Sequence, residues 1–370
     1  MVDPDFGMEG DQTLFGGKSA PRPSRSDHVH SLVVVGGPDR GKFFEVSKTP
    51  MVVGRHVSAG IVLSDRRVSS RHCRVWLDDH DVVIEDMSST NGTWLDGHRL
   101  EQPERAPIGA VLQVGECLLR HEFRSREDLK TTVELDGELK SAARYVEALL
   151  PPPRRKGFPR VEWSWHPCAT LGGDAFGYGE LEDGSFAFYL IDVCGHGASS
   201  ALHSVSVINT LRRRTLSADF SRPGNVLSAL NRAFPMESHG DMYFTIWYGV
   251  YRHAERRLRF ASGGHPPALL VAESGTEELR THNMPIGMME SIPFEEAEAE
   301  IHPGSRLYVC SDGCFEVHTS EDELLGYRDF RAIVLDSDEP EPKSIFDRVK
   351  ARSRFDVFED DFSLLLLDFQ

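Results

Sequence analysis

Short apolar runs separated by turn residues fill residues 28–124 of this 370-residue chain. Examples are "SLVVVGG", "MVVGR", "CRVWLDDHDVVIEDM" and "AVLQVGECLLRHEF". Runs of this length, bounded by Gly, Asp and Asn, are typical of β-strands joined by tight turns. We therefore predict an all-β sandwich over residues 28–124. Residues 1–27 mix Gly, Pro, Ser, Asp and Arg without a period, which predicts a disordered tail.

The hydrophobic period changes to that of a helix after residue 124. In "LKSAARYVEALLPPP" the apolar side chains of Leu139, Ala143, Val146 and Leu150 fall on one helical face, and the proline run ends the helix. A helix followed by "PPPRRKG" is typical of a hinge between modules. We predict a helical linker over residues 125–156.

Strand and helix patterns mix from residue 157 to residue 370. The strand candidates are "VEWSWHP", "SFAFYLIDV", "YFTIWYGVYR", "RLRFASGG", "PALLVAE", "SRLYVCSDG" and "FSLLLLDF", and the helix candidates are residues 199–215, 223–234 and 344–353. Several hairpins followed by helical segments predict an α+β domain with stacked β-sheets flanked by helices.

Charge and cysteine content narrow the class of protein. With 58 acidic and 41 basic residues the formal net charge is -17, which argues against general nucleic-acid binding. The 6 cysteines form no C-x-x-C pair, which is typical of reduced thiols in a cytoplasmic protein. The apolar runs are too short to span a bilayer, so we expect no membrane insertion.

Three loops of the predicted sandwich carry phosphate-binding chemistry. Arg55 follows a strand, Ser69, Ser70 and Arg71 share a second loop, and Thr90 and Asn91 share a third. A guanidinium, hydroxyls and an amide on adjacent loops suit a doubly charged phosphate. The alternative is that the Ser, Thr and Asn residues only form turns.

The motifs Gly54-Arg55, Ser69-x-x-His72 and Thr90-Asn91-Gly92 resemble, in order and type, those of forkhead-associated domains. The resemblance covers most of residues 28–124 and implies a β-sandwich that binds phosphothreonine peptides. It implies phosphopeptide contact for the six loop residues Arg55, Ser69, Ser70, Arg71, Thr90 and Asn91. It also implies that His72 braces the loop and that Gly92 adopts a backbone conformation closed to other residues.

Acidic residues recur beside the apolar runs of the C-terminal half. They are Asp174, Asp192, Asp312, Asp360 and Asp361. Carboxylates that converge at buried strand ends are costly unless a cation holds them, and Mg²⁺ or Mn²⁺ suits carboxylate and carbonyl oxygens.

Two other interpretations of this pattern stay open. Each Asp can instead cap a turn, as we expect for Asp183-Gly184. Cys194, His196 and His203 lie close in sequence and suggest zinc, although their spacing does not fit a tetrahedral site. We expect His203 to belong to the helix that begins near Ser199.

Seven motifs resemble, in order, the metal-dependent serine/threonine phosphatases of the protein phosphatase 2C superfamily. They are "LGGDAFGYGELEDG", "IDVCGHGASSAL", "DMYFTIWYGVY", "ASGGHPPALLV", "MPIGM", "LYVCSDGCFEV" and "EDDFSLLLLDF". The match covers about residues 140–370 and is most similar to the bacterial branch of the stage II sporulation phosphatase and the regulators of stress sigma factors.

This resemblance implies a pair of Mn²⁺ or Mg²⁺ ions that activate a bridging water for attack on phosphorus. Asp192 would bridge the ions, the carbonyl of Val193 would be a ligand, and Asp174 would bind directly or through water. Asp312, Asp360 and Asp361 would complete the set, although the final motif can also be read with its first acidic residue as the ligand in place of Asp361. Gly195 and Gly197 would allow a tight backbone turn beside the ions, and His196 would brace that turn instead of binding metal. Ile191 and Cys194 depart from the family pattern without removing a ligand.

The combined prediction is a cytoplasmic bacterial signalling enzyme that hydrolyses phosphoserine or phosphothreonine on a protein. The resemblance implies an anti-sigma-factor antagonist as substrate, a phosphothreonine protein or serine/threonine kinase at the N-terminal domain, and a homodimer through the linker helix. Two alternatives stay open: a catalytically inactive phosphopeptide adaptor, and a hydrolase of a small phosphorylated metabolite.

Overall fold

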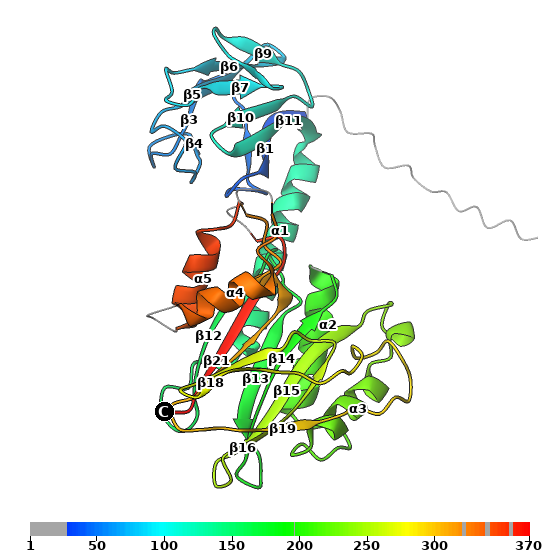
Figure 1. The fold of residues 1–370 in the computed structure, drawn as a ribbon. Helices are drawn as coiled ribbons and strands as arrows, with labels where there is room; N and C mark the ends of the chain where they lie inside the picture. Colours follow the sequence, from blue (N-terminus) through cyan, green and yellow to red (C-terminus); the bar gives the residue numbers. More distant parts are fainter. Residues whose placement is uncertain (1–27, 196, 320–322, 337–340, 355–357) are drawn as a thin grey trace, which may run out of the picture. The chain divides into compact units, whose positions relative to one another are not determined.

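The computed structural model describes residues 28–370 except 196, 320–322, 337–340 and 355–357 (Figure 1). The predicted tail, residues 1–27, and His196 therefore lie outside the described residues. The chain forms two compact units, Met1–Thr132 and Val133–Gln370, and the division falls inside one long helix. The boundaries predicted at residues 124 and 156 stay predictions.

The described part of the N-terminal unit is built from two β-sheets, which confirms the predicted sandwich. The six-stranded sheet has the order β2-β1-β11-β10-β7-β8 and the five-stranded sheet the order β4-β3-β5-β6-β9. The first sheet contains β1 (His28–Gly36), β2 (Phe43–Glu45), β7 (Thr93–Leu95), β8 (His98–Arg99), β10 (Val111–Val114) and β11 (Cys117–Ser125). The second contains β3 (Met51–Gly54), β4 (Ile61–Val62), β5 (Cys73–Asp78), β6 (Asp81–Asp86) and β9 (Glu104–Ala106).

Alternating side chains form the core of this sandwich. On β5, Cys73 and Val75 are buried while Arg74 is exposed, as expected for a strand with one face toward a core. The β5–β6 register pairs Asp78 with Asp81, and Asp79 in the turn has φ 53°, a left-handed conformation that Asp tolerates. The three loops with phosphate-binding chemistry connect the strands of this core.

The C-terminal unit contains two antiparallel five-stranded sheets, as predicted for the α+β domain. One has the order β12-β21-β20-β17-β18 and the other β13-β14-β15-β16-β19. The first contains β12 (Arg160–His166), β17 (Ala268–Ala272), β18 (Gly275–Leu279), β20 (Arg306–Cys310) and β21 (Phe362–Asp368). The second contains β13 (Ala175–Glu180), β14 (Phe186–Val193), β15 (Phe244–Arg252), β16 (Arg257–Gly263) and β19 (Ala297–Glu300).

Helices flank the two sheets. Among the described residues the α-helices are α1 (Arg126–Leu149), α2 (Ala198–Arg212), α3 (Pro223–Ala233), α4 (Gly326–Leu335) and α5 (Pro342–Lys350), and short 3₁₀ turns are η2 (Met236–Ser238) and η3 (Asp312–Cys314). Helices α2 and α3 pack on β13–β16, whereas α5 packs on β12 and β21 and against α4 (Figure 1). The sequence pattern predicted α2, α3 and α5 but missed α4, β13, β18 and β19. Strands β18 and β19 read "GTEEL" and "AEAE", and such charged edge strands lack the apolar signal of a buried one.

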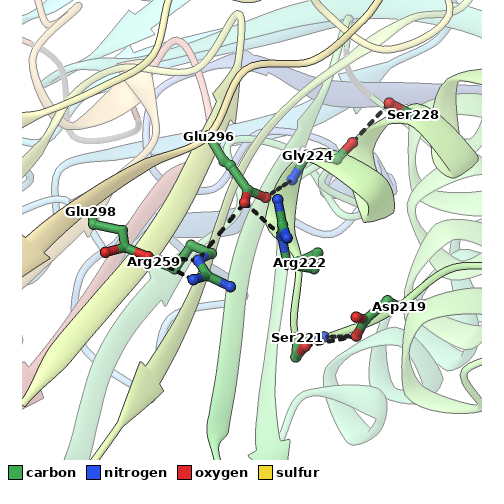
Figure 2. Close-up of polar contacts among 8 residues, drawn as sticks. All are labelled: Asp219, Ser221, Arg222, Gly224, Ser228, Arg259, Glu296 and Glu298. Atoms are coloured by element: carbon green, nitrogen blue, oxygen red, sulfur yellow. Dashed lines mark hydrogen bonds and ion pairs between the residues drawn. The ribbon is translucent and has the colours of Figure 1, made fainter. Parts of the chain in front are cut away.

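An ion-pair network fixes the start of α3 (Figure 2). The Glu296 carboxylate accepts hydrogen bonds from Arg222 Nε at 2.7 Å and from the backbone N–H of Gly224 at 3.1 Å. Arg259 lies 3.8 Å from Glu296 and pairs with Glu298 at 2.6 Å. A Cβ at Gly224 would lie 2.6 Å from the Phe294 carbonyl oxygen, so only glycine lets the helix approach this closely.

No helix among the described residues is long and apolar enough to cross a membrane. All six cysteines are free thiols. A cytoplasmic location stays a prediction.

Candidate functional site

The three phosphate-binding loops of the N-terminal unit lie against one another. The Arg55 N–H donates to the Ser69 carbonyl at 3.0 Å, and the Thr90 N–H donates to Ser69 Oγ at 3.1 Å. A Cβ on Gly54 would collide with the Ser70 carbonyl oxygen, which explains why glycine precedes Arg55. The side chains of Arg55, Ser70, Arg71, Thr90 and Asn91 are exposed, and Ser69 is half-buried. The structure therefore brings the predicted binding residues onto one exposed loop cluster.

His72 is buried and joins two of these loops. Its Nδ1 accepts the Ser69 N–H at 3.1 Å, and its Nε2 lies 3.0 Å from the Gly92 carbonyl oxygen. Gly92 has φ 80°, in the left-handed region. These contacts agree with the bracing role predicted for His72 and the conformation predicted for Gly92. Neither Arg55 nor Arg71 forms an ion pair with a carboxylate in the described part of the chain, which leaves two guanidiniums for an anion.

The acidic residues of the C-terminal unit lie at strand ends of both sheets. Asp174 precedes β13 and Asp192 lies near the end of β14, whereas Asp312 follows β20 and Asp360 and Asp361 precede β21. Strands β20 and β21 are paired through Cys310 and Leu364, so their acidic ends meet. Electrostatic interactions link Asp192 with Asp312, Asp360 and Asp361. The two sheets therefore present their acidic residues to one region.

Asp174 is the most buried carboxylate of this group. Its residue is 1% exposed, and its Oδ2 atom has no hydrogen-bond partner among the described residues. Burial, reinforced by the charges of Asp192 and Asp361, raises the pKa of Asp174 well above its usual value, although the Ser363 and Ser311 hydroxyls oppose the rise. A buried carboxylate with an unpartnered oxygen is costly unless a cation or proton neutralises it.

The pKa values of Asp192 and Asp312 are also raised by burial and by neighbouring negative charges. Burial and then the charges of Asp312, Asp360 and Asp361 raise the pKa of Asp192 to about 8. Burial and the Glu316 charge raise the pKa of Asp312. Like charges that gather in a partly buried site shift their pKa values upward together. A region with this excess of negative charge is suited to bind a cation.

Asp361 supports the backbone beneath Asp174. Its Oδ1 accepts the Cys168 N–H at 2.8 Å, and its Oδ2 accepts the N–H groups of Gly173 at 2.6 Å and Asp174 at 3.2 Å. Ligand atoms of Cys168, Asp360 and Asp361 also lie within 4.8 Å of one another, a spacing that suits a metal ion, although Asp174, Asp192 and Asp312 do not join that tight group. Three backbone hydrogen bonds leave Asp361 few lone pairs for a metal.

Glycines allow the chain to close around this region. A Cβ on Gly173 would lie 2.8 Å from the Val193 carbonyl oxygen, which therefore faces the segment before Asp174. A Cβ on Gly313 would collide with the Asp361 carbonyl oxygen. Gly195 and Gly197 have φ 79° and 93°, which gives the tight turn predicted after Val193.

The structure also places residues that the sequence pattern did not single out. Ser311 and Ser363 lie buried beside Asp174, and Thr245 pairs with Asp192 across β14 and β15 while its hydroxyl lies 2.7 Å from His265 Nδ1. The sequence offered only one signal for the two serines, which is that each lies next to acidic residues, in "CSDG" and "DDFS". A hydroxyl is common next to a ligand motif.

The zinc alternative finds no support in the described residues. The one group there with metal-ligand spacing contains neither Cys194 nor His203. His203 lies in α2, as predicted, and its ring packs 5.5 Å from that of Phe234. Asp183 caps the predicted turn by accepting the Ser185 N–H at 3.0 Å.

Comparison with protein families identifies the C-terminal unit. The model of stage II sporulation protein E (SpoIIE) matches residues 182–370, more than half of the chain. The chain belongs to the SpoIIE family. The model of the cytoplasmic domain of a type III secretion inner-membrane component matches residues 33–122.

Two curated relatives match the two units of this SpoIIE-family chain separately. Phosphoserine phosphatase RsbP of Bacillus subtilis is 30% identical over 162 residues, which cover 42% of this chain and 40% of RsbP. The FHA domain-containing protein FhaB of Mycolicibacterium smegmatis is 31% identical over 103 residues, which cover 28% of this chain and 66% of FhaB. The chain thus spans less than two thirds of either relative. The predicted fusion of a forkhead-associated domain with a protein phosphatase 2C fold is confirmed.

A solved structure supports the fold of the C-terminal part. The SiaA-PP2C domain of Pseudomonas aeruginosa superposes with a TM-score of 0.57 at 18% identity, covering 65% of this chain and 99% of that domain. At this identity the likeness concerns the fold.

Proposed function

We propose that this protein is a metal-dependent phosphatase that hydrolyses phosphoserine or phosphothreonine on a signalling protein. The observation that carries the proposal is the buried Asp174 carboxylate, whose Oδ2 has no partner among the described residues and whose neighbours are further carboxylates. The family match and the 30% identity to a phosphoserine phosphatase support it.

The acidic region fits Mn²⁺ or Mg²⁺, and we propose two ions. Its donors are carboxylate and carbonyl oxygens, which hard divalent cations prefer, and the charges that act on Asp174 and Asp192 are those of other carboxylates. Asp174, Asp192, the Val193 carbonyl, Asp312 and Asp360 are the proposed ligands. Because Asp361 already accepts three backbone hydrogen bonds, we propose that it supports the ligands and contributes to metal binding mainly through its charge.

Bound divalent ions would supply an activated water and neutralise charge on the phosphoryl oxygens. The residues of the chain do the positioning. Asp361 fixes the Gly173–Asp174 backbone, and the glycines at 173 and 313 let the Val193 carbonyl and the Asp360–Asp361 turn approach. Burial and the neighbouring carboxylates raise the pKa values of Asp174 and Asp192 together, so a bound cation would compete with protons for these carboxylates. The proposed site therefore holds its carboxylates in place for metal, and these carboxylates repel one another when no metal is bound.

We propose that the N-terminal loops dock a phosphothreonine protein, a substrate or a serine/threonine kinase, through Arg55, Ser69, Ser70, Arg71, Thr90 and Asn91. The exposed guanidiniums of Arg55 and Arg71 and the hydroxyls beside them support this role. An anti-sigma-factor antagonist is the proposed substrate. Docking would then regulate or target the phosphatase, and this idea fails if a tightly bound phosphothreonine peptide leaves turnover and substrate choice unchanged.

We also propose a homodimer through α1. Leu135, Leu139 and Tyr145 of this helix are 54%, 39% and 61% exposed, which leaves apolar surface for a second copy. Sedimentation of the full chain should show a dimer that Leu135→Asp with Leu139→Asp converts to a monomer. A wild-type monomer at micromolar concentration would exclude this arrangement.

The decisive experiment measures release of phosphate from a phosphoserine protein with Mn²⁺, Mg²⁺ or EDTA. We expect metal-dependent turnover in the wild type. Asp192→Asn should lower the turnover rate about a thousandfold or more, because without bound metal only ordinary water, a much weaker nucleophile, can attack the phosphorus. Asp183→Asn, in an exposed turn, is the matched control. Absence of turnover with every metal would favour the phosphopeptide adaptor.

A further inference from the structure

A cavity of about 230 Å³ lies between strands β13–β15 and the C-terminal end of α2. It is lined by Tyr178, Tyr189, Leu211, Arg212, Arg214 and Tyr248, among others. None of the proposed metal ligands lines it. Its volume is about that of eight water molecules in the liquid, at roughly 30 Å³ each, and is below the roughly 300 Å³ of small drug-binding pockets. It has room for a small organic molecule.

Three tyrosines line this cavity, and one of them has no partner for its hydroxyl. Tyr178 donates to the Pro152 carbonyl, and Tyr248 donates to the Phe220 carbonyl at 3.0 Å. Tyr189 is 6% exposed, and its hydroxyl has no hydrogen-bond partner among the described residues. Buried tyrosine hydroxyls usually find an acceptor. The Tyr189 residue lines the cavity, but its hydroxyl oxygen is enclosed beside Gly177 and does not open into it.

Two arginines add positive charge to the same cavity. Arg212 donates from Nη1 to the Leu149 carbonyl at 3.1 Å, and Arg214 donates from Nη2 to the Glu180 carbonyl. Each guanidinium keeps further N–H donors, and within the described part of the chain neither forms an ion pair with a carboxylate. Burial raises the pKa of Tyr189, and the nearby Arg212 opposes that rise.

We propose that this cavity binds a small organic anion, a carboxylate or phosphonate-like group on a compact apolar body. Arg212 and Arg214 would hold the charged group, since guanidinium forks bind planar and tetrahedral oxyanions. Leu181, Leu211 and Phe220 would cover the apolar body.

The test is calorimetric titration of the full-length protein in EDTA, which keeps divalent metal from the acidic region. The probes are benzoate and phenylphosphonate, with inorganic phosphate and the neutral benzamide for comparison. We expect at least one of the two aromatic anions to bind, and inorganic phosphate and benzamide to bind roughly tenfold or more weakly, because each lacks one half of the ligand.

Variants locate the binding. Arg212→Gln and Arg214→Gln should each weaken binding of the anion roughly tenfold, whereas Arg213→Gln, a neighbouring exposed arginine outside the cavity, should not. Both Arg212 and Arg214 are exposed, so these variants should fold. Arg55→Ala should leave binding unchanged, which separates this cavity from the phosphopeptide loops. Failure of both anions to bind, or binding that is insensitive to Arg212→Gln and Arg214→Gln, would overturn the proposal.

Discussion

Replacement of Asp192 by asparagine should stabilise the metal-free protein while it destroys the proposed metal site. The folded structure raises the pKa of Asp192 from 3.8 to about 8 through burial and the charges of Asp312, Asp360 and Asp361. A carboxyl whose pKa is raised by folding contributes stability that is complete below pH 3.8 and is lost as the pH rises toward 8. At pH 7 this pKa shift lowers the free energy of unfolding by up to about 4 kcal/mol, since one pKa unit corresponds to about 1.4 kcal/mol.

The asparagine side chain carries no charge to titrate and has nearly the same shape as aspartate. We therefore expect Asp192→Asn to gain about 1–4 kcal/mol in EDTA at pH 7, which corresponds to roughly 2–4 °C in Tm for each kcal/mol in a domain of 150–250 residues. At pH 4 the gain should vanish. Scanning calorimetry between pH 4 and 8 measures both the gain and its pH dependence.

Mn²⁺ should reverse the order of the two proteins. The wild type should gain stability with Mn²⁺, more at pH 8 than at pH 5, because metal displaces the retained protons. Asp192→Asn should gain much less. Asp183→Asn is the control, because its pKa is lowered by Ser185 in an exposed turn and its removal should not stabilise the protein. The reasoning is refuted if Asp192→Asn lowers the Tm in EDTA at pH 7.

Three further predictions concern other parts of the chain. Arg55→Ala should weaken a matching phosphothreonine peptide roughly tenfold or more in fluorescence anisotropy, while the unphosphorylated peptide binds neither protein. His72→Ala should cost the N-terminal unit about 2–4 kcal/mol in denaturant unfolding, because a buried ring and two backbone contacts are lost, and an unchanged midpoint would contradict the bracing role. Asn231→Ala should destabilise the loop at Gly287 and Met289, to which Asn231 hydrogen-bonds at 2.8 and 2.7 Å, and faster hydrogen exchange there would show it.

The fold followed from the sequence where strands and helices carry a strong apolar period. Strand β14 and helix α3 are of this kind, since "FAFYLIDV" is a buried run and Val226, Leu227 and Leu230 share one helical face. Helix α4 was missed because "GYRDFRAIVL" begins at a glycine and mixes charged with apolar residues. A single turn of apolar burial through Phe330, Ile333 and Val334 is too short a pattern to separate from a loop.

The site was predictable by residue type but not by environment. Asp174 and Asp361 both read as acidic residues at a strand end, yet one has an unpartnered oxygen and the other accepts three backbone hydrogen bonds. That difference depends on contacts between residues 168–174 and residue 361, which are nearly two hundred positions apart. A local sequence pattern cannot predict such contacts, because the solvation of a side chain depends on which residues the tertiary fold places around it.

The repulsion within the acidic region and its proposed affinity for metal have one physical origin. Crowding of Asp174, Asp192 and Asp312 lowers the stability of the metal-free protein, and a cation bound at the proposed site would neutralise them and recover that free energy. A site that lowers stability without metal would therefore gain more stability from metal. Carboxylates that each had a hydrogen-bond or ion-pair partner would make the metal-free fold more stable and would bind the metal less tightly. Among the described residues, Asp174 Oδ2 has no hydrogen-bond partner, which is unfavourable in the metal-free protein. A fold that binds metal nevertheless has reason to keep this oxygen unpartnered.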